Sequence, residues 1–122
     1  MINDFIDERL DMTGFDFLDQ DVAMEYCAGD EEIYREVLEG YLEEDRREEL
    51  AKHYEAMDLP NYRVVAHAIK STSLTIGATE LSAKAKALEY AAADGDSGFI
   101  KENNDELVAM YTEILDKIKA AL

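Results

Sequence analysis

The stretch VVAHAIKSTSLTIGA, residues 64–78, decides the fold class of this chain. Drawn as a helix that turns by about 100° per residue, it places Val65, Ile69 and Ile76 within about 40° of one another. This is the strongest apolar seam of the stretch, so we expect it to face the core of a helical bundle. His67 falls on the opposite side of the same helix and is therefore predicted to be exposed to solvent.

The segments before and after this stretch show further helical periodicity. A helix is expected to begin after an N-cap at Asp30, to lose its apolar pattern at residues 43–49 and to resume as far as Met57. The helix that carries the opening stretch should have Pro60 in its first turn. It should end at Gly77, which can adopt the left-handed conformation that closes a helix.

Two more helices are expected, one at residues 79–93 and one that begins near Ser97 after the loop DGDSG. A short helix capped by Asp19 should stop at Gly29, and residues 2–11 hold either another short amphipathic helix or the end of a linker. Four principal helices joined by short turns predict an all-α fold. Its architecture is expected to be an antiparallel four-helix bundle with short additional N-terminal helices.

The length of the chain fits one domain over residues 1–122, with residues 1–14 as a candidate N-terminal extension. The net charge of −17 repels phosphates, so nucleic acids and anionic membranes are not expected as partners. The first residues lack the basic and apolar regions of a secretory signal, so none is expected there. No stretch approaches the roughly 20 apolar residues of a membrane span. The single cysteine, Cys27, cannot form an internal disulfide and fits a reducing compartment, so we expect a cytoplasmic location.

The helix face around His67 differs in charge from the rest of this acidic chain. Residues 60–86 carry four basic side chains and one acid, a net charge of +3, which leaves −20 for the other 95 residues. An apolar patch bordered by charges often marks a surface that binds a partner. The side chains within about 60° of His67 on the helix wheel are Arg63, Val64, Lys70, Ser71 and Leu74.

His67 and its neighbours fit an incoming anion better than other histidine chemistry. Zinc would require further soft ligands, and a serine–histidine pair would require an acid or amide to orient the ring, which this helix face does not carry. A neutral imidazole is a competent nucleophile near pH 7. Lys70 could stabilise phosphoryl oxygens as a point charge, and Ser71 could donate a hydrogen bond to them. The pattern predicts phosphoryl acceptance by His67; the alternative is an exposed histidine without a role, as we expect for His53 on the surface of its helix.

These residues resemble the histidine phosphotransfer (HPt) domains of multistep two-component phosphorelays. The similarity lies in an alanine–histidine–x–x–lysine core, followed by small residues, an apolar–glycine–alanine turn and a leucine. The upstream block GDEEIYREVLEGYLEE, residues 29–44, also looks like a block of the family. Nearly the whole chain takes part in the resemblance. The matching positions are Ala66, His67, Ile69, Lys70, Ser71, Ser73, Ile76, Gly77, Ala78 and Leu81, with Leu88 and Glu89 further on.

The resemblance implies a four-helix bundle in which His67 lies exposed midway along one helix. His67 would accept a phosphoryl group from an aspartyl phosphate of one receiver domain and donate it to an aspartate of another, with Lys70 assisting. Response-regulator receiver domains are the expected partners, and a hybrid sensor histidine kinase is a further candidate. One position departs from the family, which often has glycine where this chain has Ser71.

The chain is expected to be a phosphoryl carrier and not a kinase, because it has no glycine-rich nucleotide loop and no room for an ATP-binding domain. No cofactor or metal is expected on this chain; Mg²⁺ would come with the receiver domain, whose carboxylates bind it. Val64 and Leu74 are the predicted apolar docking contacts, and Arg63, Lys84 and Lys86 are further basic candidates. The alternative function is that of a bundle that transfers nothing and serves as a receiver-binding or structural interaction module.

Overall fold

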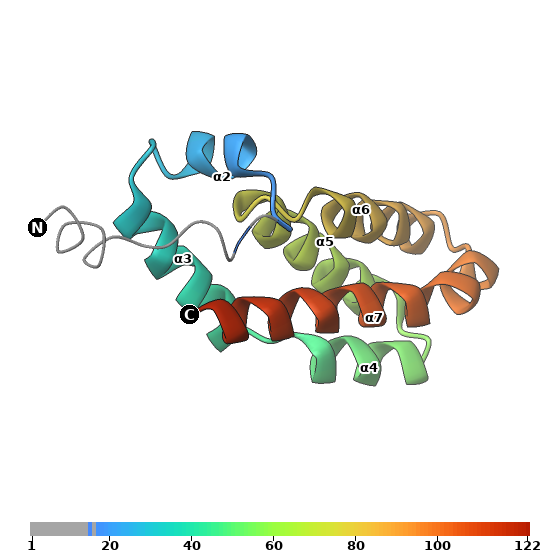
Figure 1. The fold of residues 1–122 in the computed structure, drawn as a ribbon. Coiled ribbons are helices and arrows are strands. Elements are labelled where there is room, and N and C mark those ends of the chain that lie inside the picture. The colour runs from blue at the N-terminus through green and yellow to red at the C-terminus, as the bar shows by residue number, and fades with distance from the viewer. Residues whose placement is uncertain (1–14, 16) are drawn as a thin grey trace, which may run out of the picture.

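The computed structural model describes residue 15 and residues 17–122 (Figure 1). This part of the chain contains helices and no strands, which confirms the predicted all-α class. The helix considered for residues 2–11 lies outside the described residues. Within them, no helix is both long enough and apolar enough to cross a membrane. The helices are α2 (Gln20–Tyr26), α3 (Glu31–Glu43), α4 (Arg47–Glu55), α5 (Leu59–Thr75), α6 (Thr79–Ala93) and α7 (Ser97–Ala121).

The helices form the antiparallel four-helix bundle that the sequence predicts (Figure 1). α5, α6 and α7 follow one another up and down the bundle, with α5 packed on α6 and α6 on α7. The fourth position is shared by α3 and α4, which pack on α7 and α5 respectively. α2 is the additional N-terminal helix; it packs on α5 and α3 at one end of the molecule.

The long helix predicted over residues 31–57 is broken where its apolar pattern lapses, since α3 ends at Glu43 and α4 begins at Arg47. A side chain from α7 stabilises this break. The hydroxyl of Tyr111 accepts a hydrogen bond from the backbone N–H of Arg46 at 3.1 Å and donates one to the carbonyl of Glu44 at 3.4 Å. Backbone groups that a continuous helix would pair internally are therefore satisfied by a residue distant in sequence.

The starts of α2, α3 and α5 are set by aspartates. The predicted N-caps, Asp19 and Asp30, each accept hydrogen bonds from two backbone N–H groups in the first turn of the following helix. Asp58 caps α5 in the same way through the N–H of Asn61, with Pro60 in the first turn as expected. The Asp58 cap fixes where α5 begins and therefore where His67 lies along the helix.

Gly77 ends the α5 segment with a φ of +87°, which confirms the predicted left-handed turn. The same position is also crowded. The backbone N–H of Asp19 donates a hydrogen bond to the carbonyl of Gly77 at 2.7 Å, and a Cβ on Gly77 would overlap the backbone of Asp19. Glycine is therefore needed here both for the backbone conformation and for the close approach of the segment that leads into α2.

The predicted apolar seam of α5 lies in the core, where Val65, Ile69 and Ile76 are all buried. Two polar contacts inside the core join α5 to its neighbours. The hydroxyls of Tyr41 and Ser73 lie 2.8 Å apart. The hydroxyl of Tyr62 donates to Asn104 Oδ1 at 2.8 Å. Because these buried groups are costly to leave unpaired, they fix the rotation of α5 in the bundle and keep the face opposite the seam outward.

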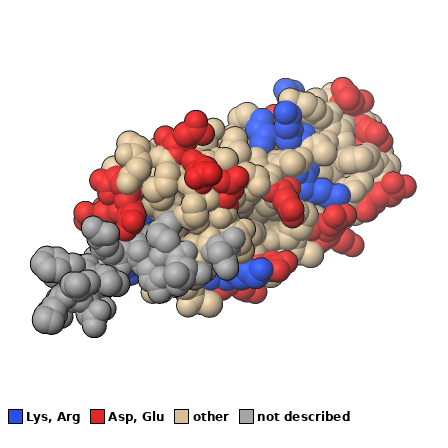
Figure 2. All heavy atoms as spheres, turned by 45° about the horizontal axis from the view of Figure 1, so that its top comes forward, with Lys and Arg blue, Asp and Glu red and all other residues tan. Residues whose placement is uncertain are grey.

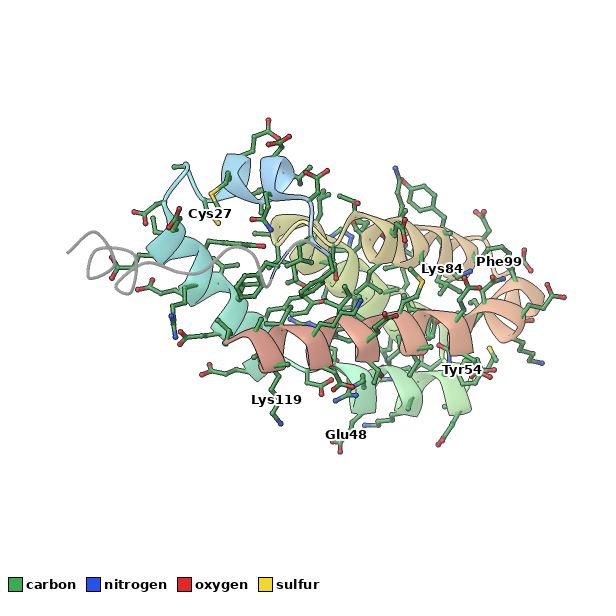
Figure 3. All side chains as sticks on the ribbon, viewed as in Figure 1. Cys27, Glu48, Tyr54, Lys84, Phe99 and Lys119 are labelled. Carbon is green, nitrogen blue, oxygen red and sulfur yellow. The ribbon has the colours of Figure 1, made fainter. Side chains whose placement is uncertain are left out.

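Cys27 lies buried where α2 leads into α3 (Figure 3). Burial raises the pKa of its thiol, and the charge of Asp30 raises that pKa further. A protonated, buried thiol is a poor nucleophile, so Cys27 packs as a small apolar residue.

Candidate functional site

His67 lies in the middle of α5 on the side turned away from the core. Its side chain is 58% exposed, which confirms the position expected from the helix wheel. The buried seam behind it, from Val65 to Ile76, prevents the helix from turning this face inward. The imidazole is therefore presented to solvent on a rigid element.

A carboxylate from the next helix holds the imidazole. Glu89 of α6 lies with its Oε2 2.8 Å from Nδ1 of His67. Its other oxygen, Oε1, forms an ion pair with Nζ of Lys70 at 2.8 Å. The side chain of Glu89 is only 9% exposed, whereas that of Lys70 is 23% exposed. One nearly buried carboxylate thus joins the two side chains predicted to handle a phosphoryl group.

The environment of Glu89 decides its charge. Burial acts to raise the pKa of this carboxyl, but the hydrogen bonds and charges of Lys70 and His67 outweigh it and leave the pKa lowered. The carboxylate is therefore ionised near pH 7 and can only accept a hydrogen bond. A neutral imidazole must then carry its proton on Nδ1, so that the lone pair of Nε2 faces outward.

A second contact sets the packing of α5 on α6 beside this site. The hydroxyl of Ser82, on α6, donates a hydrogen bond to the backbone carbonyl of Lys70 at 2.9 Å. The small buried side chain of Ser82 lets the two helices approach closely. This contact lies between the element that carries His67 and the element that carries Glu89, so it contributes to their alignment.

Glu89 was not predicted as a site residue. The helix face of His67 carries no acid, and Glu89 lies three residues beyond the basic segment 60–86. A signal was present nonetheless. Glu89 is surrounded in its helix by the buried residues Ala85, Leu88 and Ala92, and an acid on a buried helix face requires a cationic partner.

The structure also reduces the positive charge expected around His67. Lys70 is neutralised by Glu89. Lys84 contacts Glu106 at 3.0 Å and Asn103 Oδ1 at 2.7 Å, both on α7. Figure 3 shows Lys84 between α6 and α7. The net charge of +3 for residues 60–86 therefore overstates the unpaired charge, because folding brings Glu89 of α6 and Glu106 of α7 into contact with these lysines.

The predicted docking residues do not form one continuous surface. Leu74 is half-buried and lines a groove between α5 and α6, together with exposed Ser71. Val64 is exposed one turn before His67, next to exposed Arg63, and neither of them lines that groove. Lys84 is turned toward α7 and away from this face. The structure therefore brings Ser71 and Leu74 together with Lys70 but does not bring Lys84 to them.

His53 differs from its expected position. It was expected on the surface of its helix, but its side chain in α4 is only 15% exposed. Its Nδ1 lies 3.9 Å from a carboxylate oxygen of Asp58, the residue that caps α5. Because the apolar pattern lapses at residues 43–49, periodicity does not indicate which face of α4 turns inward.

A family model described as the Hpt domain matches residues 34–120, most of the chain, and the chain therefore belongs to the Hpt domain family. Hpt domains are phosphotransfer carriers in phosphorelays and not kinases, and they interact with receiver domains of response regulators. No curated protein and no solved structure gave a match. The match begins at Tyr34, so α2 lies outside the segment that the family model covers.

Proposed function

We propose that His67 accepts a phosphoryl group from the aspartyl phosphate of one receiver domain and passes it to an aspartate of another. The observation that carries this proposal is an exposed imidazole whose Nδ1 is held 2.8 Å from a nearly buried carboxylate. This arrangement leaves Nε2 free and nucleophilic on the surface. The Hpt family supports the general role; the two-receiver transfer and the residues that perform it are our proposal.

The transfer can be written with all atoms accounted for. Nε2 of His67 attacks the phosphorus atom, an N–P bond forms, and the P–O bond to the receiver aspartate breaks. The aspartate leaves with the bonding electron pair as a carboxylate. The proton on Nδ1 stays in its hydrogen bond to Glu89, and the phosphorylated ring becomes cationic. Donation to a second receiver is the reverse of this step.

Glu89 would assist this chemistry without touching the phosphoryl group. It fixes the tautomer and the orientation of the ring before attack, which lowers the entropic part of the barrier. It also stabilises the positive charge that appears on the ring after attack. Glu89 is therefore a positioning residue whose effect passes through His67.

Lys70 and Ser71 lie on the side of His67 that faces the groove. The ammonium of Lys70 is anchored by Glu89 at 2.8 Å and can stabilise the charge of the phosphoryl oxygens as a point charge. Ser71 is exposed and can donate a hydrogen bond to the same oxygens. In this proposal Mg²⁺ is bound by the receiver domain, and this chain supplies only the imidazole and its polar neighbours. We also propose a cytoplasmic location, because receiver domains must be able to reach His67.

The test is incubation with a ³²P-phosphorylated receiver domain. Label should move to this chain and survive alkali but not acid, as expected for phosphohistidine. The variant His67→Gln should accept no label, and the matched control His53→Gln should accept label like the wild type. Equal labelling of His67→Gln would overturn the proposal. Receiver binding without any acid-labile label would favour the alternative, a bundle that binds receivers but transfers nothing.

A further inference from the structure

A groove of about 640 Å³ lies between α5 and α6 beside the His67 site. It includes Lys70 and Ser71, the residues three and four places after His67, and it continues past Leu74 toward the α5–α6 turn. Neighbours at these spacings share a helix face with His67. A partner that lies in this groove would therefore be in contact with the face that presents the imidazole.

Two exposed tyrosines line this groove from different helices. Tyr26 belongs to α2 and is 56% exposed, and Tyr90 belongs to α6 and is 55% exposed. Leu74 is a half-buried apolar residue of the same lining. Tyrosine offers a large apolar contact area at a small entropic cost, and exposed aromatic residues around a pocket are frequent hot spots of interfaces.

The position of Tyr26 is fixed by the backbone. α2 packs on α5. The hydrogen bond from Asp19 N–H to the Gly77 carbonyl, 2.7 Å long, ties the segment before α2 to the α5–α6 turn. Ala23 and Cys27 are buried beneath the helix. Because α2 precedes residue 34, where the Hpt match begins, Tyr26 is contributed by a part of this chain that the family model does not describe.

The charge of the groove differs from that of the molecule. The chain carries 29 acidic and 12 basic side chains, yet the groove lining includes no acid. Of its two lysines, Lys70 is paired with Glu89, so Lys86 carries the charge that a partner would meet. Nζ of Lys86 lies 5.7 Å from the centre of the Tyr90 ring, a contact that leaves its charge available to an incoming carboxylate. Figure 2 shows a group of basic side chains on the face that turns toward the viewer, on a surface where acidic side chains are more numerous.

We propose that this groove selects the receiver domain. Tyr26, Leu74 and Tyr90 would hold an apolar side chain of a receiver helix, and Lys86 would pair with a carboxylate beside that side chain. This inference rests on the proposed function of His67. A second copy of this chain fits the groove poorly, since two molecules with a charge of −17 each repel one another.

The test separates docking from chemistry with two phosphoryl donors. The first donor is a phosphorylated receiver domain, chosen from a panel because it labels the wild-type chain fastest. The second is phosphoramidate, a small donor that needs no docking surface. Tyr26→Ala and Tyr90→Ala should each raise the KM for the receiver by about five-fold or more while kcat stays within about two-fold, as expected of interface hot spots. Labelling of His67 by phosphoramidate should stay at the wild-type rate.

A separate variant tests the contribution of charge in the groove. Lys86→Glu should raise the KM for the receiver, and the effect should shrink as NaCl is increased, because salt screens exposed charges. The matched controls lie outside the groove. Ile33→Ala replaces an exposed apolar residue of α3, and Lys101→Glu replaces an exposed lysine of α7; both should leave KM unchanged.

The outcomes distinguish this inference from the proposed function. If phosphoramidate and the receiver both label the wild type on His67 but Tyr26→Ala and Tyr90→Ala keep the wild-type KM, the groove proposal is wrong and the carrier function stands. The groove proposal is also wrong if Val64→Ala raises the KM for the receiver while Tyr26→Ala and Tyr90→Ala do not. If neither donor labels His67 of the wild type, the carrier function itself fails. Circular dichroism of each variant establishes that the bundle is intact.

Discussion

In the proposed transfer, single residues at the site have separate tasks, one to hold a proton and another to stabilise a phosphoryl group. Glu89 lies 2.8 Å from Nδ1 of His67, and in this proposal it holds the Nδ1 proton and leaves the lone pair of Nε2 directed outward. Its second oxygen anchors Lys70 at 2.8 Å, next to the position that the phosphoryl group would take. A single nearly buried carboxylate therefore preorganises both a nucleophile and a cation, which is more economical than separate partners for each.

Removing the charge of Glu89 should slow transfer. In Glu89→Gln the amide can still contact the ring, but it no longer selects the Nδ1–H tautomer or stabilises the cationic product. We expect the single-turnover rate of transfer to His67 to fall by about 10- to 100-fold, by analogy with the loss seen when the carboxylate partner of a metal-binding histidine is removed. Glu102→Gln, an exposed substitution on α7, is the control. A wild-type rate in Glu89→Gln would contradict the role given to this carboxylate.

The same carboxyl should make stability depend on pH. The pKa of Glu89 is lowered from its ordinary value of 4.5, because Lys70 and His67 outweigh the effect of burial. A lowered pKa means that the ionised form stabilises the fold above the unfolded-state pKa and that this contribution is lost as pH falls below it. The unfolding free energy of the wild type, measured in urea, should therefore exceed that of Glu89→Gln at about pH 5, just above the ordinary pKa of the carboxyl.

Below about pH 4.5 the advantage of the wild type over Glu89→Gln should shrink as the carboxyl takes up its proton. A difference that grows on acidification would show that Glu89 is protonated more easily in the folded chain than in the unfolded one. That result would also remove the argument that fixes the tautomer of His67.

The exposure of His67 could be predicted from the sequence, but its contact with Glu89 could not. The exposure of His67 followed from the local seam of Val65, Ile69 and Ile76, because a helix wheel needs no knowledge of other elements. The contact between His67 and Glu89 joins two residues that are 22 positions apart and lie on different helices. It depends on the rotation of α6 about its own axis. Periodicity within one helix does not give that rotation, so the acid was missed although its buried surroundings were visible.

At the scale of helices and turns, the α5–α6 turn has the strictest requirement. Gly77 has a φ of +87° and no room for a Cβ, whereas Gly95 has a φ of +74° with open space around the same position. Gly77→Ala should lower the free energy of unfolding by about 2 kcal/mol or more, and Gly95→Ala by about 1 kcal/mol, since only the first adds a clash to the strain. Urea titration of both variants measures the difference; equal losses would contradict the close contact with Asp19.

The break between α3 and α4 depends on one hydroxyl from α7. Tyr111→Phe would leave the N–H of Arg46 without its partner at 3.1 Å. We expect a loss of about 1–2 kcal/mol of unfolding free energy, the cost of an unpaired group in a partly buried position. Tyr90→Phe, at an exposed position, is the control and should change stability by less than about 0.5 kcal/mol. If both variants are equally stable, the hydroxyl of Tyr111 does not hold the break.

Helix starts and stops were predictable because they depend on neighbours in sequence. Asp19, Asp30 and Gly77 each act on backbone groups within a few residues. The break at Glu44–Arg46 could be suspected from the lapse in apolar residues but not located, because Tyr111 supplies its hydrogen bonds from 65 positions further on.

The whole molecule carries a charge of −17, and its acidic side chains repel one another across a small bundle. The ion pairs on its surface are too few to offset an excess of 29 acids over 12 bases. Raising NaCl from about 10 mM to about 150 mM should therefore raise the melting temperature, since screening weakens the net repulsion more than the exposed pairs. Differential scanning fluorimetry measures this, and a melting temperature that falls over this range would contradict it.

If Glu89 holds Nδ1 of His67, Nε2 must be the atom that receives the phosphoryl group. A ¹⁵N and ³¹P NMR spectrum of the chain, labelled with ¹⁵N-histidine and phosphorylated by its receiver domain, identifies that atom. We expect one phosphohistidine, at His67, with phosphorus bonded to Nε2 and a proton retained on Nδ1. Phosphorus on Nδ1, or on any residue other than His67, would contradict it.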